Sequence, residues 1–223
     1  MIPGAIALEF PELFFGGLWV TIQISVLGLL GALILGTIVA LFRVSPLVVL
    51  RWIGGAYVEF FRNTPLIVQL FFLFLGLPFM GFRFATDTFD SIFRAAITGM
   101  ALYHAAYVAE IVRGGLLAVD KGQIEAARSL GLSYGGMLRF VQLPQTFRAV
   151  VPPLGNIAIA LVKNTSLAST IGVAELLYAA EVVETRTFRA EEAFLAATIG
   201  FLLLTIPLGV AVNALERRML IAR

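Results

Sequence analysis

The sequence predicts an all-α, polytopic transmembrane protein with five membrane-spanning helices. Three observations lead to this fold class. Of the 223 residues, 60% are hydrophobic and 13% are charged, whereas soluble domains are about half apolar and about a quarter charged. A soluble fold of this size cannot bury so much apolar surface in one core. Long stretches also lack any charge, and the basic residues gather on one side of them.

The apolar stretches have the length that a membrane span requires. A helix of about 20 residues crosses the hydrocarbon core of a bilayer, and residues 13–42 contain no charged side chain. We expect spans at residues 14–42, 52–80, 92–114, 147–170 and 192–216. Because no repeat, low-complexity tract or flexible linker divides the chain, residues 1–223 are predicted to form a single transmembrane domain.

Glycine, proline and charge distinguish these spans from one another. Gly28, Gly31 and Gly36 suit the first span to close packing against another helix. Pro65 removes a backbone hydrogen bond near the middle of the second, so the helix kinks there or begins its spanning part there. The second, third and fourth spans are interrupted by charge or proline, which is typical of helices that face a protein interior or a pore.

The basic residues near the span ends predict the orientation of the chain. With five spans, one side of the membrane receives eleven of them: Arg43, Arg51, Arg62, Arg113, Lys121, Arg128, Arg139, Arg148, Arg217, Arg218 and Arg223. The other side receives four: Arg83, Arg94, Arg186 and Arg189. Since basic residues are retained on the cytoplasmic side, the amino terminus is expected outside and the carboxyl terminus in the cytoplasm.

The longest cytoplasmic connection, residues 115–146, is predicted to be structured. Residues 123–130 are good helix formers closed by Gly131. Ser133 is a suitable cap for a second short helix, which we expect to run to Leu143 and to stop at Pro144. The protein therefore presents a compact helical knob between its third and fourth spans.

This knob carries a spaced pattern of acidic, small and apolar residues: Glu125, Ala126, Ala127, Gly131, Val141, Leu143 and Pro144. The pattern resembles the EAA signature of binding-protein-dependent ABC importer permeases, with valine at position 141 where isoleucine is usual. In that family the two short helices form a coupling helix that sits in a groove of the ATPase subunit. The resemblance implies that Glu125, Ala126, Ala127, Gly131, Leu143 and Pro144 serve ATPase coupling.

Three further stretches are similar to the branch of this family that carries histidine, glutamine, glutamate, arginine and related polar amino acids. They are residues 59–69, residues 109–115 followed by 121–123, and residues 163–167. Asn63 stands where that branch often has glycine or serine. The resemblance covers residues 14–215, nearly the whole chain, and implies a polar amino acid as substrate.

Polar side chains within the predicted spans are candidates for the substrate path. Burying such groups without partners costs several kcal/mol each, so they face partners, water or substrate. The candidates are Thr64, Gln69, Lys163, Asn164, Thr165 and Ser166. In a functional interpretation they hold a zwitterion; in a structural one, Lys163 pairs with Glu59 or Glu110 and the hydroxyls bond to their own helix.

Other charged residues favour structural interpretations. Glu59 and Arg62 can touch on one helix face, as can Glu110 and Arg113, and such pairs anchor helices near their ends. His104, the only histidine, has no partner at metal-ligand spacing in the sequence. The acidic external stretch is expected to be a solvated surface or a docking contact for an external binding protein: Glu175, Glu181, Glu184, Glu191 and Glu192.

The energy for transport is expected to come from partner subunits. Neither Lys121 nor Lys163 follows the glycine of a phosphate-binding loop, so ATP and magnesium are expected on two cytoplasmic ATPase subunits and no cofactor on this chain. The resemblance further implies a second permease copy or a paralogous permease, an extracytoplasmic binding protein, and a multi-pass location in the bacterial cytoplasmic (inner) membrane. The net charge of +2, without a long basic run, does not favour nucleic acid.

Two other functions stay open. A secondary amino-acid transporter or channel would need no ATPase, but it is expected to carry inverted repeats or a repeated ion-coordinating break. An intramembrane enzyme would use Ser166 as a nucleophile with His104 from another span, although no nucleophile-elbow motif is present.

Overall fold

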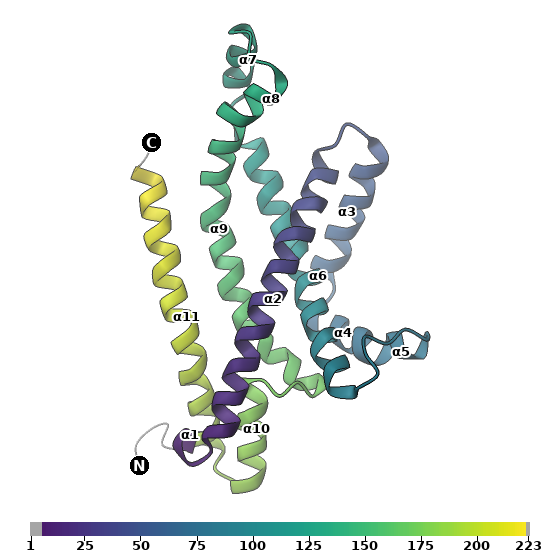
Figure 1. Ribbon diagram of the computed structural model, residues 1–223, viewed down its shortest axis with the longest axis vertical. Coiled ribbons are helices and arrows are strands. Elements are labelled where there is room, and N and C mark those ends of the chain that lie inside the picture. The colour runs from purple at the N-terminus through teal and green to yellow at the C-terminus, as the bar shows by residue number, and fades with distance from the viewer. Residues whose placement is uncertain (1–5, 222–223) are drawn as a thin grey trace.

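The computed structural model describes residues 6–221, and within that range it contains helices and no strand. In chain order the elements are α1 (Ile6–Glu9), α2 (Pro11–Val44), α3 (Val48–Asn63), α4 (Leu66–Phe71), η1 (Phe72–Gly76), α5 (Leu77–Phe79), α6 (Thr88–Leu117), α7 (Lys121–Ser129), α8 (Tyr134–Met137), η2 (Leu138–Gln142), α9 (Leu143–Asn164), η3 (Thr165–Ile171), α10 (Leu176–Thr187) and α11 (Ala190–Ile221). Long helices lie side by side, with α7 and α8 at one end and α1 and α10 at the other (Figure 1).

The predicted all-helical membrane fold is confirmed. Within residues 6–221, four helical segments are long and apolar enough to cross a bilayer, and the number becomes five when the bent pair α3 and α4–α5 is counted as one span. Helices α2, α6 and α11 each contain a predicted span and extend it by a few residues, whereas the fourth predicted span is covered by α9 together with η3. Arg223, one of the basic residues used for the orientation, lies outside the described residues.

The second span differs from the prediction of one helix at residues 52–80. Helix α3 ends at Asn63, and the segment Leu66–Phe79 leaves it at an angle of 104°. Thr64 adopts an extended conformation because the residue before a proline is pushed out of the helical region. Pro65 then begins the next helical segment. The sequence predicted a kink at this proline, and the structure has a break.

This break also moves Arg62 away from the end of the molecule to which it was assigned. The 16 residues of α3 rise about 24 Å along the helix axis. Arg62 is in the last turn, far from Arg51 near the start of the same helix, and its guanidinium lies 5.5 Å from the ring centre of Tyr107 in α6. Arg62 is exposed but lies beside the middle of α6, away from the end that carries Arg51, and therefore gives no information on the orientation.

Close packing of α2 against α6 forms the centre of the fold. A Cβ atom added at Gly28 would lie 3.0 Å from Met100, one at Gly31 would lie 2.8 Å from Ala101, and one at Gly36 would lie 2.6 Å from Val108. These three glycines follow one face of α2 and let the two backbones approach. Close approach of this kind holds helices together in lipid, where apolar burial supplies no driving force.

The substitution Gly36→Ala is expected to destabilise the protein by about 1–3 kcal/mol, since it forces an added methyl group into the contact with Val108. The matched control is Gly16→Ala in the same helix, where an added Cβ meets no atom within 4 Å. That change should be neutral or stabilising, because alanine favours helix by about 1 kcal/mol. Thermal unfolding of the purified proteins in detergent measures both; equal midpoints would contradict the packing argument.

Candidate functional site

Polar side chains gather where α9 passes into the 3₁₀ turn η3. Lys163 is exposed on this chain, and within residues 6–221 it forms no ion pair. The structural interpretation that paired it with Glu59 or Glu110 is therefore wrong. Glu110 instead binds Arg113 at 2.8 Å and Arg43 at 3.3 Å, and Glu59 accepts a hydrogen bond from Asn63. The ammonium group of Lys163 remains available to a ligand or to another subunit.

Asn164 is held by a buried histidine from another helix. Its Nδ2 atom lies 3.2 Å from Nε2 of His104, while Nδ1 of the same ring lies 2.8 Å from the carbonyl oxygen of Met100. A carbonyl can only accept, so Nδ1 carries the hydrogen and Nε2 accepts from the amide of Asn164. The imidazole is consequently neutral, and it fixes the orientation of the asparagine side chain.

The two hydroxyl side chains behave differently from Lys163 and Asn164. Thr165 is fully buried and donates to the carbonyl of Val162 at 2.7 Å; Ser166 is half-buried and donates to the carbonyl of Lys163 at 2.8 Å. Both bond back to their own helix, as the structural interpretation predicted. Thr165 faces the protein interior, and Ser166 keeps one acceptor position open beside Lys163.

Thr64 and Gln69 hold the break between α3 and α4. The amide nitrogen of Gln69 donates to the hydroxyl of Thr64 at 2.7 Å and lies 3.2 Å from the carbonyls of Thr64 and Phe61. These bonds satisfy carbonyls that the broken helix leaves without partners. The side-chain oxygen of Gln69 is buried and has no hydrogen-bond partner within residues 6–221. Gln69 thus fixes the bend and keeps one unused acceptor.

A layer of aromatic side chains on α6 completes this polar region, and sequence reasoning missed it. The hydroxyl groups of Tyr103 and Tyr107 lie 2.9 Å apart, and Arg62 from α3 lies over the ring of Tyr107. Tyr103 also packs edge-on against His104. The signal was present as a stripe of hydrogen-bonding aromatic residues three and four positions apart within an apolar span.

At the opposite end of the molecule, α7 and α8 form a compact pair in the predicted loop. Asp120 caps α7 by accepting from Gly122 at 2.8 Å, and Ser133 caps α8 by accepting from Gly136 at 3.2 Å. Gly131 forms the bend with a φ of 81°, a backbone conformation that is unfavourable for residues other than glycine. Glu125 and Ala126 are exposed on α7, whereas Ala127 is buried within the pair. Of the three, only Glu125 and Ala126 are open to a partner.

The second short helix does not stop at Pro144, contrary to the prediction. The chain remains helical from Tyr134 to Ile171, passing through the π-type turn η2 into α9. Pro144 directly follows the π-type turn η2, and its missing N–H removes one backbone hydrogen bond from the rod without ending it. The wider turn η2 accommodates the proline ring. The helix pair and the polar end of α9 are consequently joined by one continuous helical rod.

One side-chain hydrogen bond ties α7 to α9, and two more tie η2 and α9 to the end of α6. Gln145 of α9 donates to Gln123 of α7 at 2.6 Å. Gln142 donates to the carbonyl of Leu116 at 3.3 Å, and Thr146 donates to that of Gly115 at the same distance. A displacement of α7 is therefore transmitted to the start of α9 and to the end of α6.

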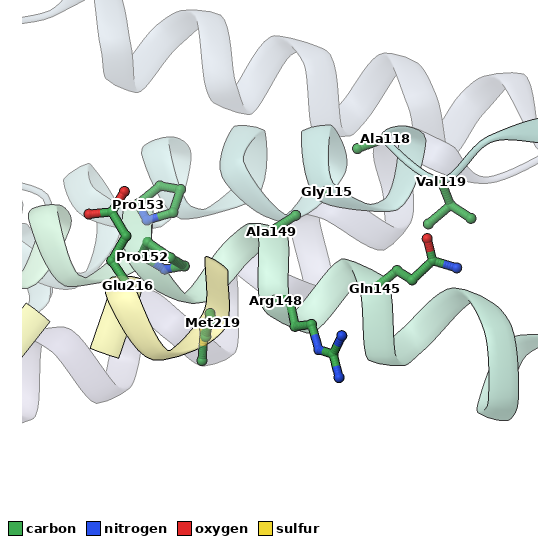
Figure 2. Close-up of a pocket in the computed structure, with 10 residues that line it drawn as sticks. All are labelled: Gly115, Ala118, Val119, Gln145, Arg148, Ala149, Pro152, Pro153, Glu216 and Met219. Atoms are coloured by element: carbon green, nitrogen blue, oxygen red, sulfur yellow. The ribbon is translucent and has the colours of Figure 1, made fainter. Parts of the chain in front are cut away.

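A groove of about 570 Å³ lies between the ends of α6, α9 and α11, close to this helix pair. Figure 2 shows Pro152 and Pro153 of α9 on one side and Glu216 and Met219 of α11 beside them. Two successive prolines inside a helix remove two backbone hydrogen bonds and weaken it there. The middle of the rod is thus its most easily bent part.

At the other end of the bundle, Glu175 was predicted to be solvated, and it is fully buried. Its Oε1 atom caps α10 by accepting from the backbone of Tyr178 at 2.8 Å, while Oε2 has no hydrogen-bond partner within the described chain. The backbone N–H of Leu176, the next residue after Glu175, donates to the hydroxyl of Thr21 in α2 at 3.2 Å. Burial raises the pKa of Glu175 to about 7, and the nearby carboxylate of Glu181 acts in the same direction.

Residues 32–221 match the family described as binding-protein-dependent transport system inner membrane component. This chain belongs to that family. It is 38% identical over 208 residues to a probable glutamine ABC transporter permease protein of Bacillus subtilis, covering 93% of this chain and 94% of that protein. It is 43% identical over 212 residues to a glutamate transport system permease protein of Corynebacterium efficiens, covering 92% and 93%.

A solved structure agrees with this assignment. A chain from the crystal structure of an amino acid ABC transporter with histidines superimposes with a TM-score of 0.88 and 31% identity, covering 98% of this chain and 99% of that one. Membership makes this protein a multi-pass inner-membrane component of a transport system. As a permease it is a transport component without its own ATPase site. Within residues 6–221, no group of three or more His, Asp or Glu side chains is arranged to hold a metal ion.

The raised pKa of Glu175 predicts a loss of stability as the pH rises. The folded protein binds this proton more tightly than the unfolded chain does. The protonated carboxyl group therefore contributes its full stabilisation below pH 4.5, and this stabilisation is lost as the pH rises through about 7. The shift corresponds to at most about 3 kcal/mol.

Replacing Glu175 with glutamine, which keeps the capping oxygen, should remove this dependence from the thermal midpoints measured between pH 4.5 and 8. The control is Glu191→Gln at an exposed position of the same acidic stretch; it should keep the wild-type slope. A slope unchanged in Glu175→Gln would show that another group titrates.

Proposed function

We propose that this chain is the permease subunit of an ATP-driven importer that moves a polar amino acid across the inner membrane by alternating access. The observation that carries the proposal is the continuous helical rod from Tyr134 to Ile171. One end of the rod belongs to the α7–α8 pair with its EAA-like pattern, and the other end bears Lys163 and Asn164. The relatives named for glutamine and glutamate support the substrate class.

The α7–α8 pair is the proposed coupling surface for the ATPase. It exposes apolar side chains that a solvated knob would bury, including Leu130 at 82%, Tyr134 at 70% and Phe140 at 67% exposure. Exposed apolar groups of this size mark a protein contact. Glu125, Ala126, Gly131, Leu143 and Pro144 lie on the same knob, with Ala127 packed inside it. A groove on the ATPase would cover this surface and receive the carboxylate of Glu125.

We infer from the distribution of basic residues that this knob lies in the cytoplasm. Without Arg62, which lies beside the middle of α6, and with Arg223 outside the described residues, basic residues near the knob end still exceed those at the other end. Two cytoplasmic ATPase subunits, which would carry ATP and magnesium, grip two such knobs. The second knob belongs to another copy of this chain or to a paralogous permease. A binding protein delivers the amino acid on the external side.

The weak middle of α9 links the two ends mechanically. Closure of the ATPases moves α7, and Gln145 and Thr146 carry that movement into α9 and α6. Pro152 and Pro153 let α9 bend between the knob and Lys163. ATP can drive this change only by binding the closed arrangement of the ATPases better than the open one.

The polar end of α9 is the proposed substrate path. The ammonium of Lys163 is a donor for the substrate carboxylate, and Asn164, fixed by His104, presents an amide at the next position. Ser166 keeps an acceptor for the substrate ammonium. In α4, which packs against η3, Gln69 has a buried acceptor without a partner at the α3–α4 break, which Thr64 supports. Thr165 is buried and maintains the turn rather than contacting substrate.

The substitution Glu125→Lys is expected to lower amino-acid-stimulated ATP hydrolysis by more than tenfold, because reversing one charge of a buried interfacial pair costs about 2–5 kcal/mol. The measurement uses the permease co-purified with its ATPase subunits in liposomes. Glu12→Lys makes the same charge change at an exposed site at the other end of the molecule and should leave hydrolysis intact. Normal assembly and coupled hydrolysis in Glu125→Lys would disprove the coupling assignment.

The substitution Lys163→Met is expected to raise the half-saturating amino-acid concentration for uptake by about tenfold or more, since it removes a charge-assisted hydrogen bond that contributes about 1.5–3 kcal/mol. Lys163→Arg, which keeps the charge, should retain most of the affinity. Uptake into liposomes measures both, and basal ATP hydrolysis should not change. If Lys163→Met transported with wild-type affinity, Lys163 would not contact the substrate.

A further inference from the structure

The buried imidazole of His104 determines which end of the Asn164 amide is left for a ligand. The ring is 2% exposed, with Nδ1 against the carbonyl of Met100 and Nε2 against Nδ2 of Asn164. A charged imidazolium, which would donate from both nitrogens, is unfavourable because neither of these partners carries a charge. Since the neutral ring donates from Nδ1, Nε2 is an acceptor. Asn164 must therefore turn its nitrogen toward the ring and its oxygen away from it.

The oxygen that Asn164 turns away from the ring is unused. Within residues 6–221, Oδ1 of Asn164 accepts no hydrogen bond, and it is not among the side-chain atoms that are buried without a partner. Asn164 is half-buried, and the residue before it, Lys163, is exposed. A fixed, accessible acceptor therefore lies next to the ammonium-bearing residue in the chain.

Two neighbouring side chains also use their donors within the protein and keep acceptors. The hydroxyl of Ser166 donates to the carbonyl of Lys163 at 2.8 Å. The amide nitrogen of Gln69 donates to Thr64 at 2.7 Å, and Oε1 of Gln69 has no partner within residues 6–221. Helix α4, which carries Gln69, packs against η3 in one hydrophobic cluster. The polar end of α9 thus combines one cationic donor with three acceptor oxygens.

This set of groups suits one kind of side chain on a bound amino acid. The α-carboxylate pairs with Lys163, and the α-ammonium satisfies part of the acceptor set. A side-chain carboxylate has only acceptor atoms and would face the oxygen of Asn164 without a hydrogen between them. A side-chain cation would add a second positive charge near Lys163, which has no ion pair within the described chain to balance it. A carboxamide is uncharged and donates two N–H groups.

We propose that His104 is a specificity-determining residue of this permease, which holds the nitrogen of Asn164 and thereby selects a carboxamide amino acid over an acidic one. The inference rests on the proposed function, which places the substrate at the polar end of α9. His104 acts through Asn164 and does not touch the substrate, so it is a positioning residue. A site built to hydrogen-bond a substrate group rejects analogues that leave its own polar group unpaired.

Two substitutions separate this positioning role from a structural one. In His104→Gln, the side-chain amide can donate to Met100 through its nitrogen and accept from Asn164 through its oxygen, so the preference for glutamine over glutamate should persist. In His104→Asn, the shorter side chain keeps a donor near the position of Nδ1 but does not reach Asn164. The Asn164 amide is then free to rotate and present its N–H groups, and the preference should fall by about fivefold or more.

The experiment measures equilibrium binding of radiolabelled glutamine to the permease–ATPase complex in nanodiscs, with unlabelled glutamate as the competitor. The binding protein is omitted, so the measured preference belongs to the permease. The wild type should bind glutamine about tenfold or more tightly than glutamate. Ser25→Ala is the matched control, because it removes a buried hydroxyl that donates to its own helix at 2.7 Å. Its ratio of affinities should equal that of the wild type.

The outcomes separate this inference from the proposed function. Glutamate binding as tight as glutamine binding in the wild type would overturn the inference while the importer function stands. A glutamine preference that survives in His104→Asn would overturn the role of His104. Equal losses of affinity for both amino acids in His104→Asn and His104→Gln would make His104 a structural residue and overturn it too. A wild-type complex that neither binds nor transports an amino acid would overturn both proposals.

Discussion

Lipid offers no hydrogen-bond partner to a backbone amide or carbonyl, and every interruption of a helix in this protein has to meet that constraint. At the α3–α4 break, Gln69 and Thr64 supply the partners. Where α9 ends, the chain tightens into η3, and the hydroxyls of Thr165 and Ser166 bond the last carbonyls. The side chains that satisfy these free backbone carbonyls bring hydrogen-bond donors and acceptors together within the bundle. The proposed substrate path is located where the helices are interrupted, because only there does an apolar bundle need polar groups.

The same constraint explains why α9 suits a mechanical role. A helix with all its backbone bonds intact is stiff, whereas Pro152 and Pro153 leave two carbonyls without helical donors. The bend between the α7–α8 pair and Lys163 is therefore confined to a short region beside the groove of Figure 2. The glycine contacts of α2 with α6 hold the neighbouring helices as a fixed reference. In the proposed mechanism, movement at the knob changes the position of Lys163 relative to that reference instead of deforming the whole bundle.

Features that depend on local composition could be predicted from the sequence. Features that depend on contacts between residues far apart in the chain could not. Uncharged runs located the spans, and Gly28, Gly31 and Gly36 indicated a close helix contact. Pro65 indicated a kink, but the angle depends on contacts of α4 that a local pattern does not contain. The Asn164–His104 contact joins positions 60 residues apart. Pro144 was read as a helix stop because the π-type turn that accommodates it has no sequence signal, and Glu175 was read as solvated because loop carboxylates usually are.

Helix α10 joins two unexpected features over only 12 residues. Its first turn is capped by buried Glu175, the backbone N–H of Leu176 beside it donates to Thr21 of α2, and its end carries Phe188, which has a φ of 57° and is 87% exposed. Between them, Glu181 accepts a hydrogen bond from Ser169 of η3 at 3.3 Å. Helix α10 therefore contacts the turn that directly follows Lys163 and Asn164. The polar end of α9 is thus connected to the α7–α8 pair through the rod and to the opposite end of the molecule through α10. The proton on Glu175 belongs to this second connection, since ionising a carboxyl buried against α2 loosens the contact that holds α10 in place.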